Sequence, residues 1–190
     1  MENSAGRRRP DGAMVARQRN RPMSHTPSPE SVRIVQFPET RVAVMTHRGD
    51  PARIGETIRR FIDWRKAHGL PPRTHATFNI LHGAPDQGAP GDFRLDLCVA
   101  TDRAVTEDGS GVVAGLLAGG RCAVLRHVGP DDALGAAFAC LYGQWLPDSG
   151  EELRGDPPFL QRVAFFPDVP EHEAVVDIFL PLRPSNQPQV

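Results

Sequence analysis

The hydrophobic positions of the chain fall into eight short apolar runs and two longer stretches with helical spacing. The short runs are rich in β-branched residues, which is typical of strands. They predict strands at residues 32–35, 41–47, 76–82, 93–100, 111–117, 121–127, 159–166 and 174–182. Segments rich in glycine and proline, at residues 83–92 and 146–158, predict loops between strands.

The two longer stretches predict amphipathic helices. The first begins at Asp50-Pro51, a helix cap followed by a proline suited to the first helical position, and it ends at Gly69. The second spans residues 130–145. Their apolar faces hold Ile54, Ile58, Phe61 and Ile62 in the first helix and Leu134, Phe138, Leu141 and Tyr142 in the second. The predicted order of elements is therefore β-α-β-β, twice.

The two halves also repeat each other in sequence. Residues 41–49 and 121–129 share Arg, Ala, Val, His and Gly at matching positions, and Asp96 matches Asp177 in a later strand. An internal duplication predicts one α+β domain at residues 31–185, with halves at about 31–102 and 111–183. We expect antiparallel sheet with both helices on one face and a cleft on the pseudo-twofold axis.

Composition narrows the class of protein. The chain has 190 residues, 39% of them hydrophobic, and a formal net charge of −1, which gives no overall attraction to nucleic acid. Residues 1–30 are basic and poor in large apolar residues, so they predict a disordered leader. No apolar run approaches the roughly 20 residues that span a bilayer. Three cysteines without a paired motif favour buried thiols in a reducing cytoplasm.

The ordered motifs resemble the GyrI-like family. They are Gly119–Gly129, a helix carrying Tyr142 and Trp145, then Phe159, and then the apolar strand at residues 176–182. The family includes the DNA gyrase inhibitory protein and the effector-binding domains of AraC-type regulators, and the resemblance covers residues 32–183. It implies a tandem βαββ fold whose groove receives hydrophobic, often cationic, small molecules, including drugs.

The resemblance also suggests where a ligand would bind. Many members have a glutamate directly after the residue that matches Phe159, and that carboxylate pairs with a cationic ligand. Here the position is Leu160, so Glu173 or Glu171 would have to replace it. Aromatic side chains offer flat contact area with a polar edge. The expected ligand-binding residues are Tyr142, Trp145, Trp64, Phe61, Phe159 and Glu173. Several of these aromatics would equally suit the core.

The leading functional prediction is a stand-alone small-molecule-binding protein that senses or sequesters a hydrophobic or cationic ligand, in transcription regulation or drug and toxin sequestration. No helix-turn-helix pair precedes the domain, so direct sequence-specific DNA binding is not expected. One alternative is a hydrolase of reactive natural products, with Glu171 or Glu173 as catalytic residue. The other is a protein that binds DNA gyrase or a regulator protein. No cofactor or membrane partner is expected.

The repeated His and Asp residues have a structural interpretation as well. His47 and His127 lack a convergent carboxylate, so no metal site is expected. Asp96 and Asp177 are expected to bond to backbone or to an arginine, such as Arg41 or Arg121. We expect the function to depend on positions where the copies differ, namely Ile62 against Tyr142 and Arg65 against Trp145.

Overall fold

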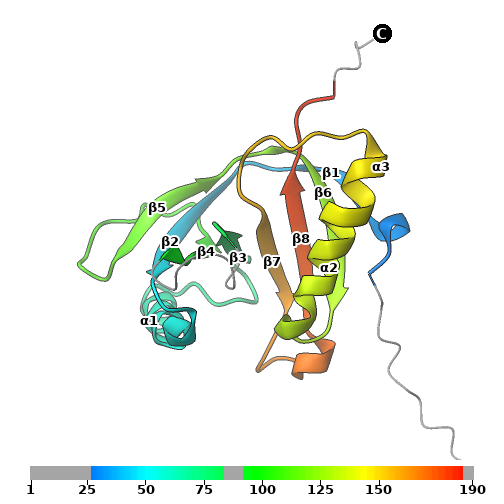
Figure 1. Cartoon of the computed structure of the whole chain (residues 1–190). Helices are drawn as coiled ribbons and strands as arrows, with labels where there is room; N and C mark the ends of the chain where they lie inside the picture. The colour runs from blue at the N-terminus through cyan, green and yellow to red at the C-terminus, as the bar shows by residue number, and fades with distance from the viewer. Residues whose placement is uncertain (1–26, 84–91, 186–190) are drawn as a thin grey trace, which may run out of the picture.

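The computed structural model describes residues 27–83 and 92–185, which form one eight-stranded antiparallel sheet and two helical segments (Figure 1). The strand order is β1-β6-β8-β7-β3-β4-β2-β5. The strands are β1 (Arg33–Phe37), β2 (Thr40–Arg48), β3 (Thr77–Leu81), β4 (Arg94–Ala100), β5 (Val112–Leu117), β6 (Gly120–Val128), β7 (Phe159–Ala164) and β8 (Val175–Pro181). This architecture confirms the predicted α+β fold. The predicted leader up to residue 26, and most of the predicted loop at residues 83–92, lie outside the described residues.

The first strand of each repeat is exchanged between the halves. β1 pairs with β6 of the second half, and β5 pairs with β2 of the first. Because β1 leads into β2 and β5 leads into β6, the two connections pass each other. They meet where Phe37 pairs with Gly120, and a Cβ atom on Gly119 would lie 2.7 Å from the backbone nitrogen of Glu39. This crossing therefore requires the glycine at position 119.

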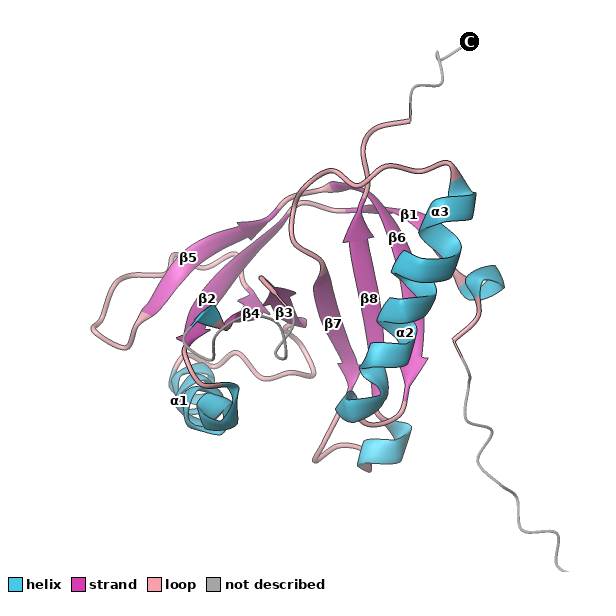
Figure 2. Cartoon of the chain, viewed as in Figure 1, coloured by secondary structure: helices cyan, strands magenta, loops and turns pink. Residues whose placement is uncertain are grey.

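Both helices cover the same face of the sheet (Figure 2). The first is α1 (Ile54–Ala67), which packs on β2 and β4, and the second begins with α2 (Leu134–Cys140), which packs on β6 and β8. One row of side chains runs across this whole face. It consists of Met45, Leu97, Asn79, Leu160, Ile178 and Leu125, in spatial order. No described helix is long and apolar enough to cross a membrane.

The opposite face of the sheet carries a second apolar layer. Four phenylalanines from four different strands form its centre, and the rings of Phe159 and Phe179 stack at 4.7 Å. Phe37 lies edge-on to the other three, with ring centroids between 4.8 and 6.0 Å away. Phe37 and Phe78 come from the first repeat, whereas Phe159 and Phe179 come from the second. This cluster therefore joins the two copies into one core.

The second helix changes its winding at its centre. α2 passes into a π-helical turn, η5 (Leu141–Trp145), and then into α3 (Leu146–Ser149). Pro147 is the second residue of α3, just after this turn. A proline has no N–H, and its ring would crowd the carbonyl four residues earlier in an α-helix, so a wider turn accommodates it. The helix consequently continues to Ser149, beyond its predicted end at residue 145.

Candidate ligand-binding face between the repeats

The π turn shifts the correspondence between the two copies by one residue. His47 and His127 lie 80 positions apart, but Gly69 and Gly150, which end the two helices with positive φ, lie 81 apart. The extra residue is inserted in the π turn. Trp145 therefore corresponds to Trp64, and Arg65 corresponds to Leu146. This corrects the predicted match of Arg65 with Trp145.

The pseudo-twofold axis passes between the two central strands. β3 and β7 pair directly, and Asn79 faces Leu160, its own counterpart in the other repeat. The helix-side residues of this pair are Thr77, Asn79, Leu81, Leu160 and Arg162. Leu81 packs against the cores of both halves, which places it at the junction. We call these five residues, with the facing flanks of the two helices, the inter-repeat face.

One flank of α1 turns toward this face and the other turns away. On the outer flank, Arg60 donates to the Ser110 carbonyl and Trp64 Nε1 donates to Asp108, both in the segment that leads to the sheet edge at β5. On the inner flank, Arg65 donates to Thr77 of β3 at 2.9 Å. The helical stripe that ends at Arg65 therefore borders the inter-repeat face.

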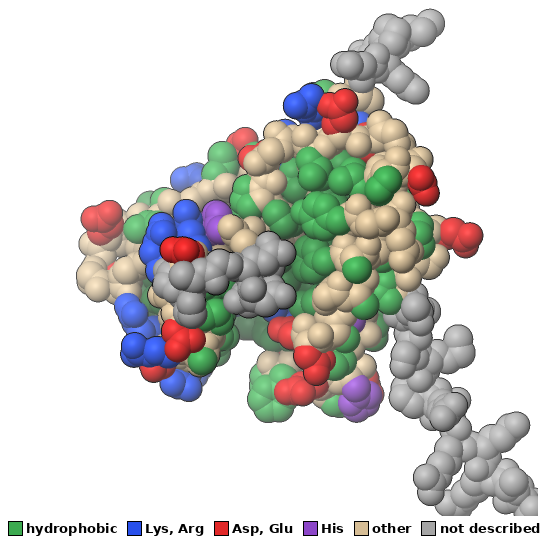
Figure 3. Space-filling model, in the orientation of Figure 1, with side chains coloured by type: hydrophobic (Ala, Val, Ile, Leu, Met, Phe, Trp, Pro, Cys, Tyr) green, Lys and Arg blue, Asp and Glu red, His purple; other side chains and the backbone are tan. Residues whose placement is uncertain are grey.

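Large apolar side chains on the inner flanks remain exposed. Ile58 and Ile62 of α1 are 38% and 43% exposed. The matching flank of the second helix holds Phe138 and Tyr142, whose rings stack at 6.4 Å, and Tyr142 is 39% exposed. Figure 3 shows hydrophobic side chains gathered over β7 and beside α2 on this side of the molecule. Exposed apolar side chains grouped in this way mark a binding surface more often than isolated ones do.

The floor of the inter-repeat face carries a polar network. Arg162 Nε donates to Asn79 Oδ1 at 2.8 Å, and its Nη1 donates to Asp131 Oδ1 at 2.5 Å. Arg65 is 6% exposed and donates to the Leu70 carbonyl at 3.0 Å as well as to Thr77. Among the described residues, no carboxylate lies within ion-pair distance of Arg65, and burial lowers its pKa to about 10. Arg65 therefore remains a buried cation at neutral pH.

The predicted ligand-binding aromatics occupy three different environments. Tyr142 and Trp145 lie in the π turn, and burial raises the pKa of the Tyr142 hydroxyl. Phe61 and Trp64 are buried between α1 and the sheet, and the indole of Trp64 stacks on His68 at 4.1 Å beside a cavity of about 80 Å³. Phe159 lies on the opposite face of the sheet. Of these aromatics, Tyr142 borders the inter-repeat face, whereas Trp145, the counterpart of Trp64, packs against the core of the second half.

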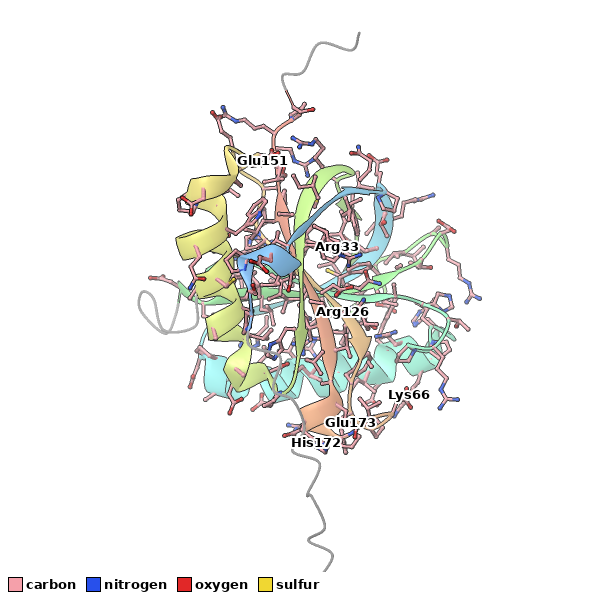
Figure 4. All side chains as sticks on the ribbon, turned by 90° about the vertical axis from the view of Figure 1, so that its right-hand side faces the viewer. Arg33, Lys66, Arg126, Glu151, His172 and Glu173 are labelled. Carbon is pink, nitrogen blue, oxygen red and sulfur yellow. The ribbon has the colours of Figure 1, made fainter. Side chains whose placement is uncertain are left out.

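The two predicted acidic residues lie at the end of the molecule. Glu171 and Glu173 belong to a 3-10 turn, η6 (Glu171–Glu173), and both are exposed. The Glu173 side chain is 61% exposed, and its carboxylate lies 3.5 Å from His172 Nε2. Figure 4 shows Glu173 and His172 beside the lower end of β8. A general base must lie within hydrogen-bond reach of its substrate or of one bridging water, and among the described side chains of β3 and β7 none has a hydrogen bond or ion pair to either glutamate.

The repeated aspartates accept hydrogen bonds from side chains of their own and neighbouring strands. Burial disfavours the charged form of Asp96, but hydrogen bonds from Arg94, Thr46 and His82 outweigh burial and lower the pKa of Asp96 below its usual value. Asp177 accepts two hydrogen bonds from Arg126. The predicted structural role is thus supported, although the arginines are Arg94 and Arg126 and not Arg41 and Arg121. The guanidinium groups of Arg94 and Arg126 lie on the same face of the sheet as the aspartates, within hydrogen-bond distance of their carboxylates.

The repeated histidines are buried and bonded within their own loops. Nε2 of His47 donates to the Asp50 carbonyl and Nε2 of His127 donates to the Pro130 carbonyl, both at 3.1 Å. The two rings therefore do not converge on a common site. In the described part of the chain, no group of three or more His, Cys, Asp or Glu side chains is arranged to hold a metal ion.

The residues that sequence reasoning missed are Thr77, Asn79, Arg162 and Asp131. Thr77 and Asn79 lie on β3, Arg162 lies on the neighbouring strand β7, and Asp131 lies just before α2. None of the four belongs to a repeated motif. A signal was present in the duplication itself. Once the offset of 81 is applied, Asn79 matches Leu160 and Arg162 matches Leu81, so polar residues stand against apolar ones at the centre of the domain.

Comparisons with known proteins identify a family that matches most of the chain. A family model for the GyrI-like small molecule binding domain matches residues 30–183, which confirms the resemblance inferred from the sequence. The probable transcriptional regulator YgiV of Escherichia coli K12 is 35% identical over 152 residues, covering 80% of this chain and 95% of YgiV.

Two solved structures share the fold at low sequence identity. The crystal structure of the EcmrR C-terminal domain matches with a TM-score of 0.65 and 18% identity, covering 80% of this chain and 96% of that one. A hydrolase encoded by lin2189 from Listeria innocua matches with a TM-score of 0.58 and 14% identity, covering 84% of this chain and 94% of that one. At such identities, the likeness establishes the shared architecture.

Proposed function

The chain belongs to the GyrI-like family of small-molecule-binding domains, and from this premise we propose that it binds a hydrophobic or amphipathic molecule on the inter-repeat face. The observation that carries the proposal is the pair of facing helix flanks. Ile58, Ile62 and Tyr142 leave apolar surface exposed on both sides of the central strands. A flat or elongated apolar molecule between them would remove this surface from water, at about 25 cal/mol per Å² buried.

The proposed role is binding without chemical conversion. In the polar network of the inter-repeat face, the carboxylate is that of Asp131, which pairs with Arg162. The two glutamates of the hydrolase alternative lie elsewhere. The relative YgiV is named a probable transcriptional regulator, which supports a sensing role for the bound molecule.

Fluorescence energy transfer from tryptophan to a pyrene probe tests the proposal. The chain has two tryptophans, so Trp64→Phe leaves Trp145, in the same helical turn as Tyr142, as the single donor. Uncharged 1-pyrenebutanol should quench Trp145 emission in a saturable manner. Tyr142→Ala should weaken binding about tenfold, because it removes an aromatic contact surface.

Phe166→Ala provides the matched control. This side chain is 72% exposed in the turn between β7 and β8, so the substitution removes an aromatic ring outside the inter-repeat face. Its affinity for 1-pyrenebutanol should equal that of the parent protein. Absence of saturable quenching, or equal losses from Tyr142→Ala and Phe166→Ala, would contradict the proposed site.

A further inference from the structure

The inter-repeat face is chemically asymmetric although its backbone is nearly symmetric. Five polar residues lie on one side of the axis or at its centre, and each has an apolar counterpart in the other repeat. The polar set is Arg65, Thr77, Asn79, Arg162 and Asp131, and the counterparts are Leu146, Pro158, Leu160, Leu81 and Pro51, in the same order. Side chains at the axis of a duplicated fold therefore change from polar to apolar across it.

The polar residues form one connected end of the face. Thr77 and Arg162 are cross-strand partners, and Thr77 accepts a hydrogen bond from Arg65. Arg162 in turn bonds to Asn79 and Asp131. We call these five residues the cationic end, because two arginines and one aspartate leave a formal charge of +1.

The structure of this face points to a ligand with an anionic head group, and we propose that the protein selects elongated amphipathic anions, such as carboxylates or sulfonates with an apolar body. The head group would lie against Arg162 at the cationic end, and the body would extend over Leu160 and Leu81 between the helix flanks. This inference rests on the proposed binding function and specifies the charge of its ligand.

Three features of Arg162 suit it to this role. Its side chain retains 21% exposure, so the guanidinium is reachable from the face. Asp131, which neutralises it, is 57% exposed, so an incoming anion can replace this partner at little cost. Arginine also offers a planar fork of donors that fits a carboxylate with two parallel hydrogen bonds. Arg65, buried and without a carboxylate partner among the described residues, adds positive potential from below.

The test compares three probes that share one apolar body. 1-Pyrenebutyrate is anionic, 1-pyrenebutylamine is cationic and 1-pyrenebutanol is neutral at pH 7. The Trp64→Phe protein should bind the carboxylate about tenfold more tightly than the alcohol, as expected for a hydrogen bond to a charged group, and should bind the ammonium probe most weakly. Arg162→Leu, which copies the counterpart Leu81, should abolish this preference, so that the carboxylate and the alcohol bind with equal affinity.

Arg126→Leu is the control for net charge. Arg126 pairs with Asp177 on the sheet face away from α2, so the substitution removes the same charge outside the inter-repeat face (Figure 4). It should leave the order of the three probes unchanged. A second variant covers the case in which Arg162→Leu fails to fold. Asp131→Asn removes the competing carboxylate and should tighten binding of the carboxylate probe by up to about fivefold.

The outcomes separate the two proposals. If none of the three probes binds, the proposed function fails. If the alcohol binds through Tyr142 but the carboxylate gains nothing, or the ammonium probe binds most tightly, the binding function stands and the anion inference is overturned. Equal effects of Arg162→Leu and Arg126→Leu would also overturn it, since they would indicate a non-specific influence of net charge.

Discussion

The duplication provides a direct measure of one buried hydrogen bond. Nε2 of both repeated histidines donates to a carbonyl, so in the neutral ring Nδ1 must act as an acceptor. In the first copy, Thr57 donates to His47 Nδ1 at 2.8 Å. In the second copy the matching residue is Ala137, and Nδ1 of His127 is buried without a hydrogen-bond partner among the described residues. The second copy therefore shows what the first would become without its hydroxyl.

Thr57→Ala should destabilise the protein by about 2 kcal/mol, since it leaves a second buried acceptor without a donor. For a domain of this size the loss corresponds to a fall of roughly 4–8 °C in the melting temperature. Thr57→Ser is the matched control, because it keeps the hydroxyl and loses one methyl group, at about 0.8 kcal/mol. Conversely, Ala137→Ser would give His127 Nδ1 a hydrogen-bond donor and should raise the free energy of unfolding by about 1 kcal/mol.

Thermal and chemical unfolding of the four proteins would measure these differences. Thr57→Ala should be clearly less stable than Thr57→Ser. If these two variants unfold together, and Ala137→Ser is no more stable than the parent protein, then the hydroxyl does not satisfy the imidazole and the comparison between the copies is wrong.

Three further predictions concern packing, acid stability and thiol chemistry. Gly119→Ala should lower the free energy of unfolding by about 1–3 kcal/mol, because its Cβ would meet the Glu39 backbone. Gly135→Ala lies in α2, where no atom is within 4 Å of the added Cβ, so it should raise the free energy of unfolding by about 0.5–1 kcal/mol. Urea unfolding measures both changes. The lowered pKa of Asp96 contributes stability above the usual aspartate pKa, near 4, that is lost as pH falls through the folded-state value. The difference in free energy of unfolding between the parent protein and Asp96→Asn should therefore become smaller as pH falls from 6 to 3. A difference that does not change with pH would contradict this stabilising role of the Asp96 carboxylate. Burial raises the pKa of all three cysteine thiols, so Ellman's reagent should react with them only after unfolding, and fast reaction of the native protein would show that they are accessible.

Most of the fold could be predicted from local patterns. Apolar runs and helical spacing located every strand and both helices, because each element buries one face. The exchange of β1 and β5 could not be predicted in this way, since strand pairing depends on contacts between residues far apart in the chain. The π turn was also missed, because Pro147 indicates an end to an α-helix and gives no sign of a wider winding.

The residues of the candidate site were harder to predict, for a related reason. Aromatic residues such as Phe159 and Trp64 suit a ligand and a core equally well, and only their position in the sheet and helix decides between the two. Arg162 and Asn79 gave no motif to recognise. Their significance follows from the register of β3 with β7 and from the one-residue insertion that aligns them with Leu81 and Leu160.

A crystal structure of the protein with 1-pyrenebutyrate would test the central claim most directly. The pyrene ring should lie between Ile62 and Tyr142, with the carboxylate within hydrogen-bond distance of the Arg162 guanidinium. A probe bound outside the inter-repeat face would contradict the proposed site. A probe bound there with its carboxylate toward Leu81 and away from Arg162 would contradict the assignment of the cationic end.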